Sequence, residues 1–176
     1  MKIFSAIILL ALTGTVVTAQ IKLADIKEDA WYSIIACHSG KALEIQGAGK
    51  DNGLQLQQNE PTGADNQLFQ FKQIQSGYFQ ITVEHSGKVL EVRDGSMKDH
   101  AVVQQNEANG KDYQLFTVVK ETSGNYRIIA RHSGYGFDVL GGVNALSNNV
   151  PVVVYPATGA RNQTFKLVAA KPAPAK

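Results

Sequence analysis

The sequence has little charge, a single cysteine and no long apolar run. Charged residues make up only 18% of the 176 residues, and the formal net charge is +2. A chain without a basic excess gains little affinity for nucleic acid from phosphate neutralisation. One cysteine excludes an intramolecular disulfide and a zinc site built from several cysteines. The sequence therefore predicts no nucleic-acid partner, no cofactor and no metal.

The longest apolar stretch, residues 3–17, follows Lys2 and is too short to span a membrane comfortably. A basic residue, an apolar segment and small residues ending at Ala19 are typical of a secretory signal peptide. We interpret residues 1–19 as that signal, with the mature chain beginning near Gln20. The protein is expected to be secreted, extracellular or periplasmic, without insertion into a membrane.

The most informative feature is a threefold repeat. The tripeptide His-Ser-Gly begins at His38, His85 and His132, at intervals of 47 residues. A Leu-Glu-Ile motif and a Gln-Leu-Phe motif recur in the same register, and their third copies read Phe-Asp-Val and Gln-Thr-Phe. The third Gln-x-Phe follows after 49 residues, so the third copy has two extra residues between Val139 and Val150. Three motifs in one register indicate an internal repeat.

Each copy has the pattern of four short strands. Apolar residues alternate ahead of each His-Ser-Gly turn, with the period of a strand. No segment of ten or more residues has a sustained helical period. Twelve strands in three units predict an all-β fold, a β-trefoil of three 47-residue repeats with pseudo-threefold symmetry, in which closure removes exposed sheet edges. The expected core layers are Tyr32, Phe79 and Tyr126; Ile34, Ile81 and Ile128; and Phe69, Phe116 and Phe165.

Over residues 31–168 the repeat resembles the Gln-x-Trp repeat of ricin B-type β-trefoil lectins, with Phe in place of Trp in all three copies. The segments outside it, residues 20–30 and 169–176, are interpreted as flexible ends. The resemblance implies carbohydrate binding. In that family each copy can present a carboxylate after its second strand, then a Gln and an aromatic residue, and finally an Asn-Gln pair.

These residue types suit a sugar. A carboxylate accepts hydrogen bonds from two hydroxyls, an Asn amide both donates and accepts, and an aromatic ring covers the apolar C–H face. By the resemblance, the third copy ranks first, because it alone keeps the Asp, the aromatic residue and the Asn; it has lost only the Gln, at Val153. The longer loop of residues 140–149 is expected to wall this pocket. The third-copy candidates are Asp138, Tyr155, Asn162 and Gln163.

The first copy ranks second, because its polar set is nearly intact although Asn59 stands where the aromatic residue is expected. The second copy ranks last, because Tyr113 replaces the Asn. The first-copy candidates are Glu44, Gln57, Asn59, Asn66 and Gln67, and the second copy has Glu91, Gln104, Asn106, Tyr113 and Gln114.

A structural interpretation is also open for these residues. The repeated glutamines Gln67, Gln114 and Gln163 are expected mainly to satisfy backbone groups. In the same way, Asp138 could cap a turn and Tyr155 could be an ordinary residue of a strand surface.

Two other features suggest chemistry less strongly. The three repeated histidines lie in turns, and the repeat alone explains their recurrence, so a metal site is not favoured. The lone Cys37 is predicted to face solvent, where it could link two chains in a dimer. No catalytic Ser-His-Asp set or carboxylate pair is evident.

The sequence therefore predicts a secreted, non-enzymatic carbohydrate-binding protein. The alternative is a protein-interaction or scaffold β-trefoil with degenerate sugar sites, since fold alone does not fix function. An enzyme acting on glycans has no support in the residues.

Overall fold

The computed structural model describes residues 22–23 and 26–172. In that part of the chain the helical elements are 3-10 turns of three residues, and no helix is long and apolar enough to cross a membrane. The 3-10 turns are η1 (Gln46–Ala48), η2 (Asp65–Gln67), η3 (Arg93–Gly95), η4 (Asp112–Gln114), η5 (Gly142–Asn144) and η6 (Arg161–Gln163). The strands are β1 (Lys22–Leu23), β2 (Ala30–Ala36), β3 (Ala42–Ile45), β4 (Leu56–Asn59), β5 (Phe69–Gln75), β6 (Tyr78–Val83), β7 (Val89–Val92), β8 (Ala101–Asn106), β9 (Phe116–Lys120), β10 (Tyr126–Ala130), β11 (Gly136–Val139), β12 (Val150–Tyr155) and β13 (Phe165–Pro172).

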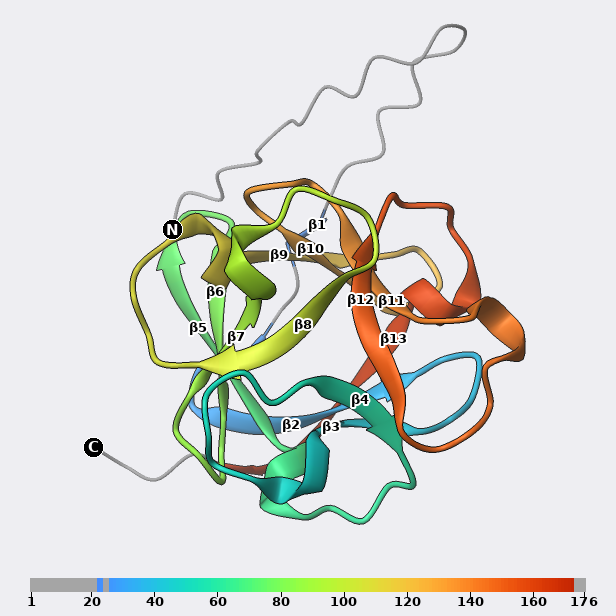
Figure 1. Ribbon diagram of the computed structural model, residues 1–176, viewed down its shortest axis with the longest axis horizontal. Helices are drawn as coiled ribbons and strands as arrows, with labels where there is room; N and C mark the ends of the chain where they lie inside the picture. The colour runs from blue at the N-terminus through green and yellow to red at the C-terminus, as the bar shows by residue number, and fades with distance from the viewer. Residues whose placement is uncertain (1–21, 24–25, 173–176) are drawn as a thin grey trace, which may run out of the picture.

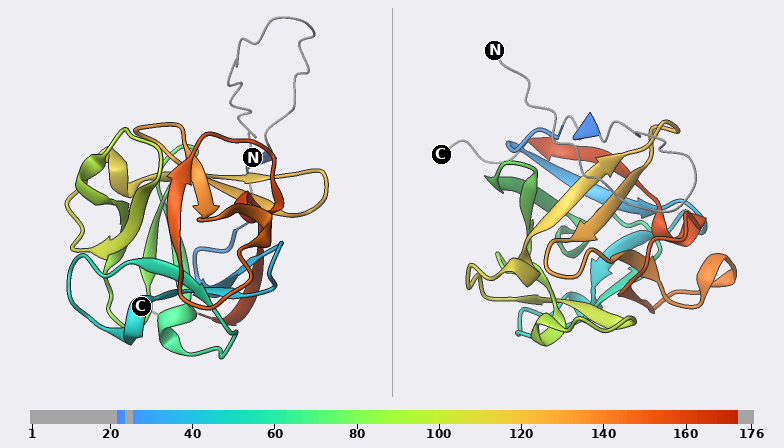
Figure 2. Two further views of the ribbon diagram at one scale, coloured as in Figure 1. Left: turned by 45° about the vertical axis from the view of Figure 1, so that its right-hand side comes forward. Right: turned by 90° about the horizontal axis from the view of Figure 1, so that it is seen from above.

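Six of the strands close into an antiparallel barrel. The order around it is β2, β5, β6, β9, β10 and β13, and the pairing of β13 with β2 completes the ring (Figures 1 and 2). Closure leaves this ring without an edge strand.

Three hairpins pack together beside the barrel: β3–β4, β7–β8 and β11–β12 (Figure 1). Strand β12 pairs with both β4 and β8, and an isolated bridge between Gln55 and Gln104 joins the other two hairpins. The first strand of each hairpin is buried along its whole length. The hairpins are therefore part of the core, and the candidate carboxylates belong to their buried, paired strands.

The core contains the residues that the sequence pattern predicted. In the barrel the ladder pairs Tyr32 with Phe69, Phe79 with Phe116 and Tyr126 with Phe165. The three phenylalanines of the Gln-x-Phe motifs and the three repeated isoleucines are fully buried, whereas Tyr126 is half-buried. The hairpins add buried residues to the same cluster, among them Phe137, whose ring meets Phe116 edge-on at 5.2 Å between centroids.

The described residues of the two segments that were expected to be flexible include strands. Strand β1 pairs with β9, and β13 continues to Pro172, pairing Lys171 with Trp31 across a register shift. The reason is that β2 begins at Ala30 and so offers a partner beyond the repeat. A proline at the end of the ladder fits, because the N–H it lacks is not needed there. The predicted signal peptide and residues 173–176 lie outside the described residues.

The packing predicts a large cost for truncating a barrel phenylalanine. Phe116→Ala removes a fully buried ring that contacts Phe137, and we expect a loss of about 3–5 kcal/mol in the free energy of unfolding. Val168→Ala is the control, because Val168 lies in the same barrel and is 49% exposed; its cost should stay below about 1 kcal/mol. Urea denaturation measures both, and equal costs would contradict the assigned core.

Candidate functional site

Three carboxylates occupy equivalent places in the three hairpins. Glu44, Glu91 and Asp138 are each the third residue of a hairpin's first strand, and they are 8%, 2% and 9% exposed. A carboxylate buried to this extent must be hydrogen-bonded to remain ionised. The number of protein donors around each one decides whether it has room for a ligand.

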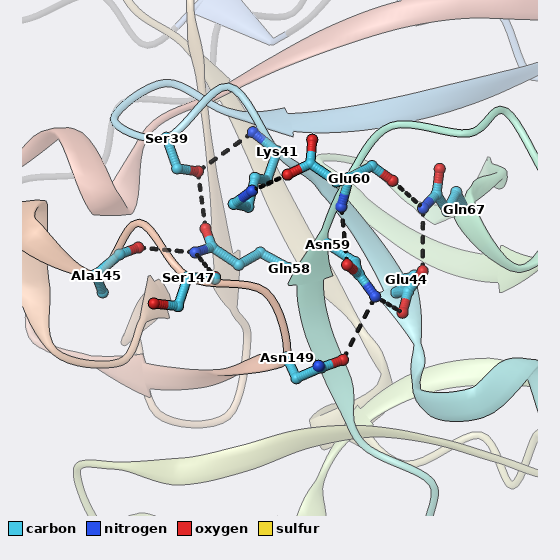
Figure 3. Close-up of polar contacts among 10 residues, drawn as sticks. All are labelled: Ser39, Lys41, Glu44, Gln58, Asn59, Glu60, Gln67, Ala145, Ser147 and Asn149. Atoms are coloured by element: carbon cyan, nitrogen blue, oxygen red, sulfur yellow. Dashed lines mark hydrogen bonds and ion pairs between the residues drawn. The ribbon is translucent and has the colours of Figure 1, made fainter.

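The Glu44 carboxylate is saturated by amide donors. Its Oε1 accepts hydrogen bonds from Gln57 Nε2 at 3.0 Å and Asn59 Nδ2 at 2.8 Å. Its Oε2 accepts from Gln67 Nε2 at 3.0 Å and Asn66 Nδ2 at 3.5 Å. The structure thus brings all five first-copy candidates together, but they bind one another. Figure 3 shows part of this network.

A residue from the third repeat closes the same network. The Asn149 Oδ1 accepts from Gln57 Nε2 at 2.9 Å. It also lies 3.4 Å from Asn59 Nδ2, and Figure 3 shows this second contact. Its backbone is left-handed, with φ of 62°, a conformation that Asn tolerates better than most residues. The NH₂ groups of Gln57 and Asn59 therefore each bind two acceptors within the protein, Glu44 and Asn149.

The loop that carries Asn149 is held in place by Gln58. The Gln58 Nε2 donates to the carbonyls of Ala145 at 2.7 Å and Ser147 at 2.8 Å, while its Oε1 accepts from Ser39 Oγ at 2.8 Å (Figure 3). Gln58 is fully buried, so each of these bonds replaces a solvent contact that the amide has lost.

The second carboxylate is also engaged. Glu91 Oε1 accepts from Gln104 Nε2 at 2.9 Å and Asn106 Nδ2 at 2.8 Å, and its Oε2 accepts from Gln114 Nε2 at 2.8 Å. Tyr113, which stands in place of the family Asn, lies against η3: a Cβ at Gly95 would come within 2.6 Å of the ring. In the second copy the Tyr113 ring therefore packs closely against the η3 turn.

Asp138 has fewer donors than the two glutamates. Its Oδ1 accepts from Asn162 Nδ2 at 2.9 Å and its Oδ2 from Gln163 Nε2 at 2.8 Å. In the ladder Asp138 faces Val153, at the register where the other copies place Gln57 and Gln104. The missing Gln, which the sequence suggested was a defect, leaves acceptor positions of the Asp138 carboxylate open.

An open cavity of about 420 Å³ lies over Asp138. Tyr155 and Asn162 line it beside the carboxylate, so the structure brings three of the third-copy candidates to one cavity. One wall comes from residues 140–143 of the longer loop, which include the two exposed apolar side chains Leu140 and Val143.

The fourth third-copy candidate, Gln163, is bound within the protein, as are its equivalents. Gln163 Oε1 accepts from the backbone N–H of Thr158 at 2.8 Å, and its Nε2 donates to the carbonyl of Pro156 at 3.0 Å. Gln67 and Gln114 make the same two kinds of backbone contact in their own copies. The predicted structural role of these glutamines is confirmed by these contacts.

Sequence reasoning missed His100, which also lines the cavity. Its ring centroid lies 4.7 Å from that of Tyr155, with 52° between the planes. His100 belongs to the second repeat, whereas Asp138 and Tyr155 belong to the third. The sequence holds one indication of this residue, its position in the repeat. His100 occupies the same position as Gly53 and Asn149 in the other two copies, and all three residues have positive φ.

The balance between burial and hydrogen bonds shifts the pKa values of Glu44 and Asp138 in opposite directions. Burial alone raises the pKa of Glu44, but the amides of Asn59, Gln67, Gln57 and Asn66 outweigh it and hold that pKa below its usual value. Burial also raises the pKa of Asp138, and here the bonds from Gln163 and Asn162 and the nearby histidines are too few to reverse it. Asp138 is thus the less stabilised anion, with more to gain from further donors.

The repeated histidines connect neighbouring loops. The Nε2 atoms of His38, His85 and His132 lie 3.1, 2.8 and 3.0 Å from the carbonyl oxygens of Ala145, Gly49 and Ser96. Because a carbonyl only accepts, each Nε2 carries the proton. Burial lowers the pKa of His38. In the described part of the chain, no three His, Cys, Asp or Glu side chains are grouped as metal ligands.

Cys37 is half-exposed, and its carbonyl accepts a hydrogen bond from Arg161 Nη2 at 2.9 Å. A dimer through its thiol stays a prediction.

Comparison with known proteins places the chain in a family. The chain matches the model described as ricin-type beta-trefoil lectin domain-like over residues 20–106 and 65–155. It is similar to the solved structure of a designed threefold symmetric protein, ThreeFoil, at 36% identity and a TM-score of 0.76, over 78% of this chain and 97% of that one. The chain therefore belongs to the ricin-type β-trefoil lectin-like domain family, as the resemblance predicted.

Two further solved structures illustrate the range of the fold. An exo-β-1,3-galactanase from Clostridium thermocellum is 28% identical with a TM-score of 0.78, over 82% of this chain but only 31% of the enzyme. A ricin B-like lectin from Macrolepiota procera, solved with lactose, has a TM-score of 0.71 over 84% of this chain and 100% of the lectin, at 14% identity, which supports the fold alone. No curated protein matches the chain.

The saturated network predicts that Glu44 is a stabilising residue. In Glu44→Gln an NH₂ group replaces one acceptor oxygen and faces amide donors, so we expect a loss of about 1–3 kcal/mol in the free energy of unfolding. Glu60→Gln is the control, because the Glu60 side chain is 65% exposed and pairs with Lys41; it should cost less than about 1 kcal/mol.

The same pair of variants has a pH signature. The pKa of Glu44 is lower folded than unfolded, so its contribution is present above the unfolded value and is lost as pH falls through the folded one. The stability gap between wild type and Glu44→Gln should shrink below the ordinary value of 4.5. Chemical denaturation at a series of pH values measures it, and a gap that is constant down to pH 3 would rule out this role.

Proposed function

We propose that the protein is a carbohydrate-binding protein and that the cavity over Asp138 is its sugar site. The observation that carries this is the incomplete coordination of the Asp138 carboxylate, which has two protein donors where Glu44 has four. Vicinal sugar hydroxyls are the donors that such a carboxylate lacks. Tyr155, on the same cavity, offers a ring for the apolar C–H face.

We infer one functional site in each chain. The three copies are interpreted as 47-residue units around a pseudo-threefold axis, of which only the third keeps an open pocket. In the first unit Asn149 binds an amide that also binds the saturated carboxylate, and in the second the Tyr113 ring packs against η3. A shallow single site suggests weak binding of a monosaccharide, with Kd of about 1 mM, or about −4 kcal/mol.

The sugars named in related structures support a glycan ligand. The solved neighbours include a lectin with lactose, an earthworm lectin with GalNAc and a Polyporus squamosus lectin with a sialylated galactoside. We propose that this chain binds without hydrolysis. Glycoside hydrolysis ordinarily needs a pair of carboxyl groups across the bond, and among the described residues that line the cavity Asp138 is the sole carboxylate.

The site of action is proposed to lie outside the cytoplasm. The support is the basic residue, the apolar segment and the small residues within residues 1–19. N-terminal sequencing of the protein recovered from its native host would test this proposal, with a start near residue 20 as the expected result.

The proposed site predicts a single stoichiometric binding event. A glycan array should identify a ligand for the wild type, and calorimetry should then give one site per chain. Asp138→Asn should lower the affinity for that ligand by about 10-fold or more, because an NH₂ donor replaces one acceptor oxygen. Tyr155→Ala, which leaves the carboxylate in place, should also weaken it, by about 3-fold or more.

Asp112→Asn is the matched control, because the Asp112 side chain is 58% exposed and does not line the cavity; thermal melting must show that every variant is folded. Unchanged affinity in both site variants contradicts the proposal. A wild type that binds no glycan, but recovers a protein partner in a pull-down insensitive to free sugars, would establish the scaffold alternative.

Acid should release the sugar. Protonation removes an acceptor position from Asp138, and the pKa of this group is raised by burial, so affinity should begin to fall at a higher pH than an ordinary Asp value of 3.8 would give. NMR titration of the sugar between pH 3.5 and pH 7 measures this. The residual affinity of Asp138→Asn should change less with pH over the same range. A wild-type affinity that stays constant down to pH 3.5 would contradict this prediction.

A further inference from the structure

Each carboxylate site borders one residue from the preceding repeat. These residues are Gly53, His100 and Asn149, with φ of 81°, 58° and 62°. Each donates its backbone N–H to a carbonyl of the adjoining hairpin, that of Gln105, Val154 or Gln58, always at 2.9 Å. The backbone at this position is thus fixed by the same bond in all three repeats, while the side chain differs.

The first site shows that this position can deliver a side chain to a carboxylate pocket. Asn149 reaches across the boundary between repeats and accepts a hydrogen bond from Gln57, a direct partner of Glu44. At the second site the equivalent residue is Gly53, which has no side chain to deliver. The position therefore acts on the neighbouring site, and its residue type decides what it adds there.

His100 adds a ring to the open site. Its imidazole is tilted against Tyr155 at 4.7 Å between centroids and lines the cavity over Asp138. The side chain is 54% exposed, and its Nδ1 lies 3.7 Å from Asp99 Oδ2, beyond hydrogen-bond distance. Two adjacent rings make a larger platform than Tyr155 alone, and the imidazole nitrogens remain available to a hydroxyl.

We propose that His100 is a sugar-contacting, specificity-determining residue of the third pocket, supplied by the second repeat. Its ligand is a neutral hexose residue with a hydroxyl bound to Asp138, while the next hydroxyl around the ring bonds to the imidazole. This inference rests on the proposed function. It predicts that the protein distinguishes between sugars that differ at a hydroxyl that Asp138 does not contact.

The chain itself offers substitutions that preserve the backbone. A bulky residue at positive φ is strained, but Asn and Gly are tolerated there, and they occupy the two equivalent positions. His100→Asn and His100→Gly therefore remove the ring while keeping the turn. Asn149→Gly is the matched control, because it makes the same kind of change at the closed first site.

The experiment uses the full mature chain and the methyl glycoside of the hexose identified by the glycan array, with its set of monodeoxy analogues. NMR titration should give about 3- to 10-fold weaker binding of the parent glycoside by His100→Asn and His100→Gly. In the wild type, one monodeoxy analogue should bind much more weakly than the parent glycoside. In both His100 variants that analogue and the parent glycoside should bind equally well. Asn149→Gly should match the wild type, and the His100 imidazole signals should shift on titration.

Unchanged affinity, or an unchanged ranking of the analogues, in both His100 variants overturns the assignment. If Asp138→Asn loses the sugar while the His100 variants behave as wild type, this inference alone fails. If the wild type binds no glycoside on the array, the proposed function fails, and this inference fails with it.

Discussion

The hydrogen bond between a buried carboxylate and the glutamine of the Gln-x-Phe motif connects the two parts of this fold. It joins Gln67 to Glu44, Gln114 to Glu91 and Gln163 to Asp138, at 3.0, 2.8 and 2.8 Å. The carboxylate belongs to a hairpin, while the glutamine ends the 3-10 turn that leads to a barrel strand two residues later. Each glutamine also binds backbone groups of the loop before its turn. A charge that must be paired when buried thereby fixes how each hairpin sits on the barrel.

The proposed function arises from the same constraint with fewer donors. In the first and second repeats, the hairpin's other strand supplies two amides to the carboxylate, from Gln57 and Asn59 or from Gln104 and Asn106. In the third repeat, Val153 and Tyr155 replace them, so only the donors next to the barrel remain. A shorter Asp accompanies the change, and Tyr155 lines the cavity together with Asp138. The structural bond is kept, and the remaining acceptor positions become available to a ligand.

The register of the repeat predicted the fold because the core is built from apolar residues that recur at equivalent positions in each copy. The phenylalanines at 69, 116 and 165 recur in register, and the structure buries all three in equivalent ladder pairs. Register could not predict whether the first site was open, because Gln57 and Asn59 have the same polarity whether they face a sugar or their own carboxylate. The answer depends on Asn149, which comes from another repeat. His100 was missed for the same reason: a repeat-by-repeat comparison assigns each site to one copy, whereas the structure builds it from two.

The loop that carries His100 is held by fewer side chains than its counterparts. Gln58 binds two carbonyls of the loop before Asn149, and Gln105 binds those of Gly49 and Asp51 in the loop before Gly53. The equivalent residue in the third repeat is Val154, which has no amide. In the described residues, the loop before His100 therefore keeps the bond from His132 to Ser96 and the backbone bond from His100 to Val154. Replacement of polar residues by Val153 and Val154 in one strand thus has two consequences. It frees the carboxylate of the third site, and it removes a side-chain restraint from the loop that borders it, so the open pocket and its least restrained wall have a common origin in β12.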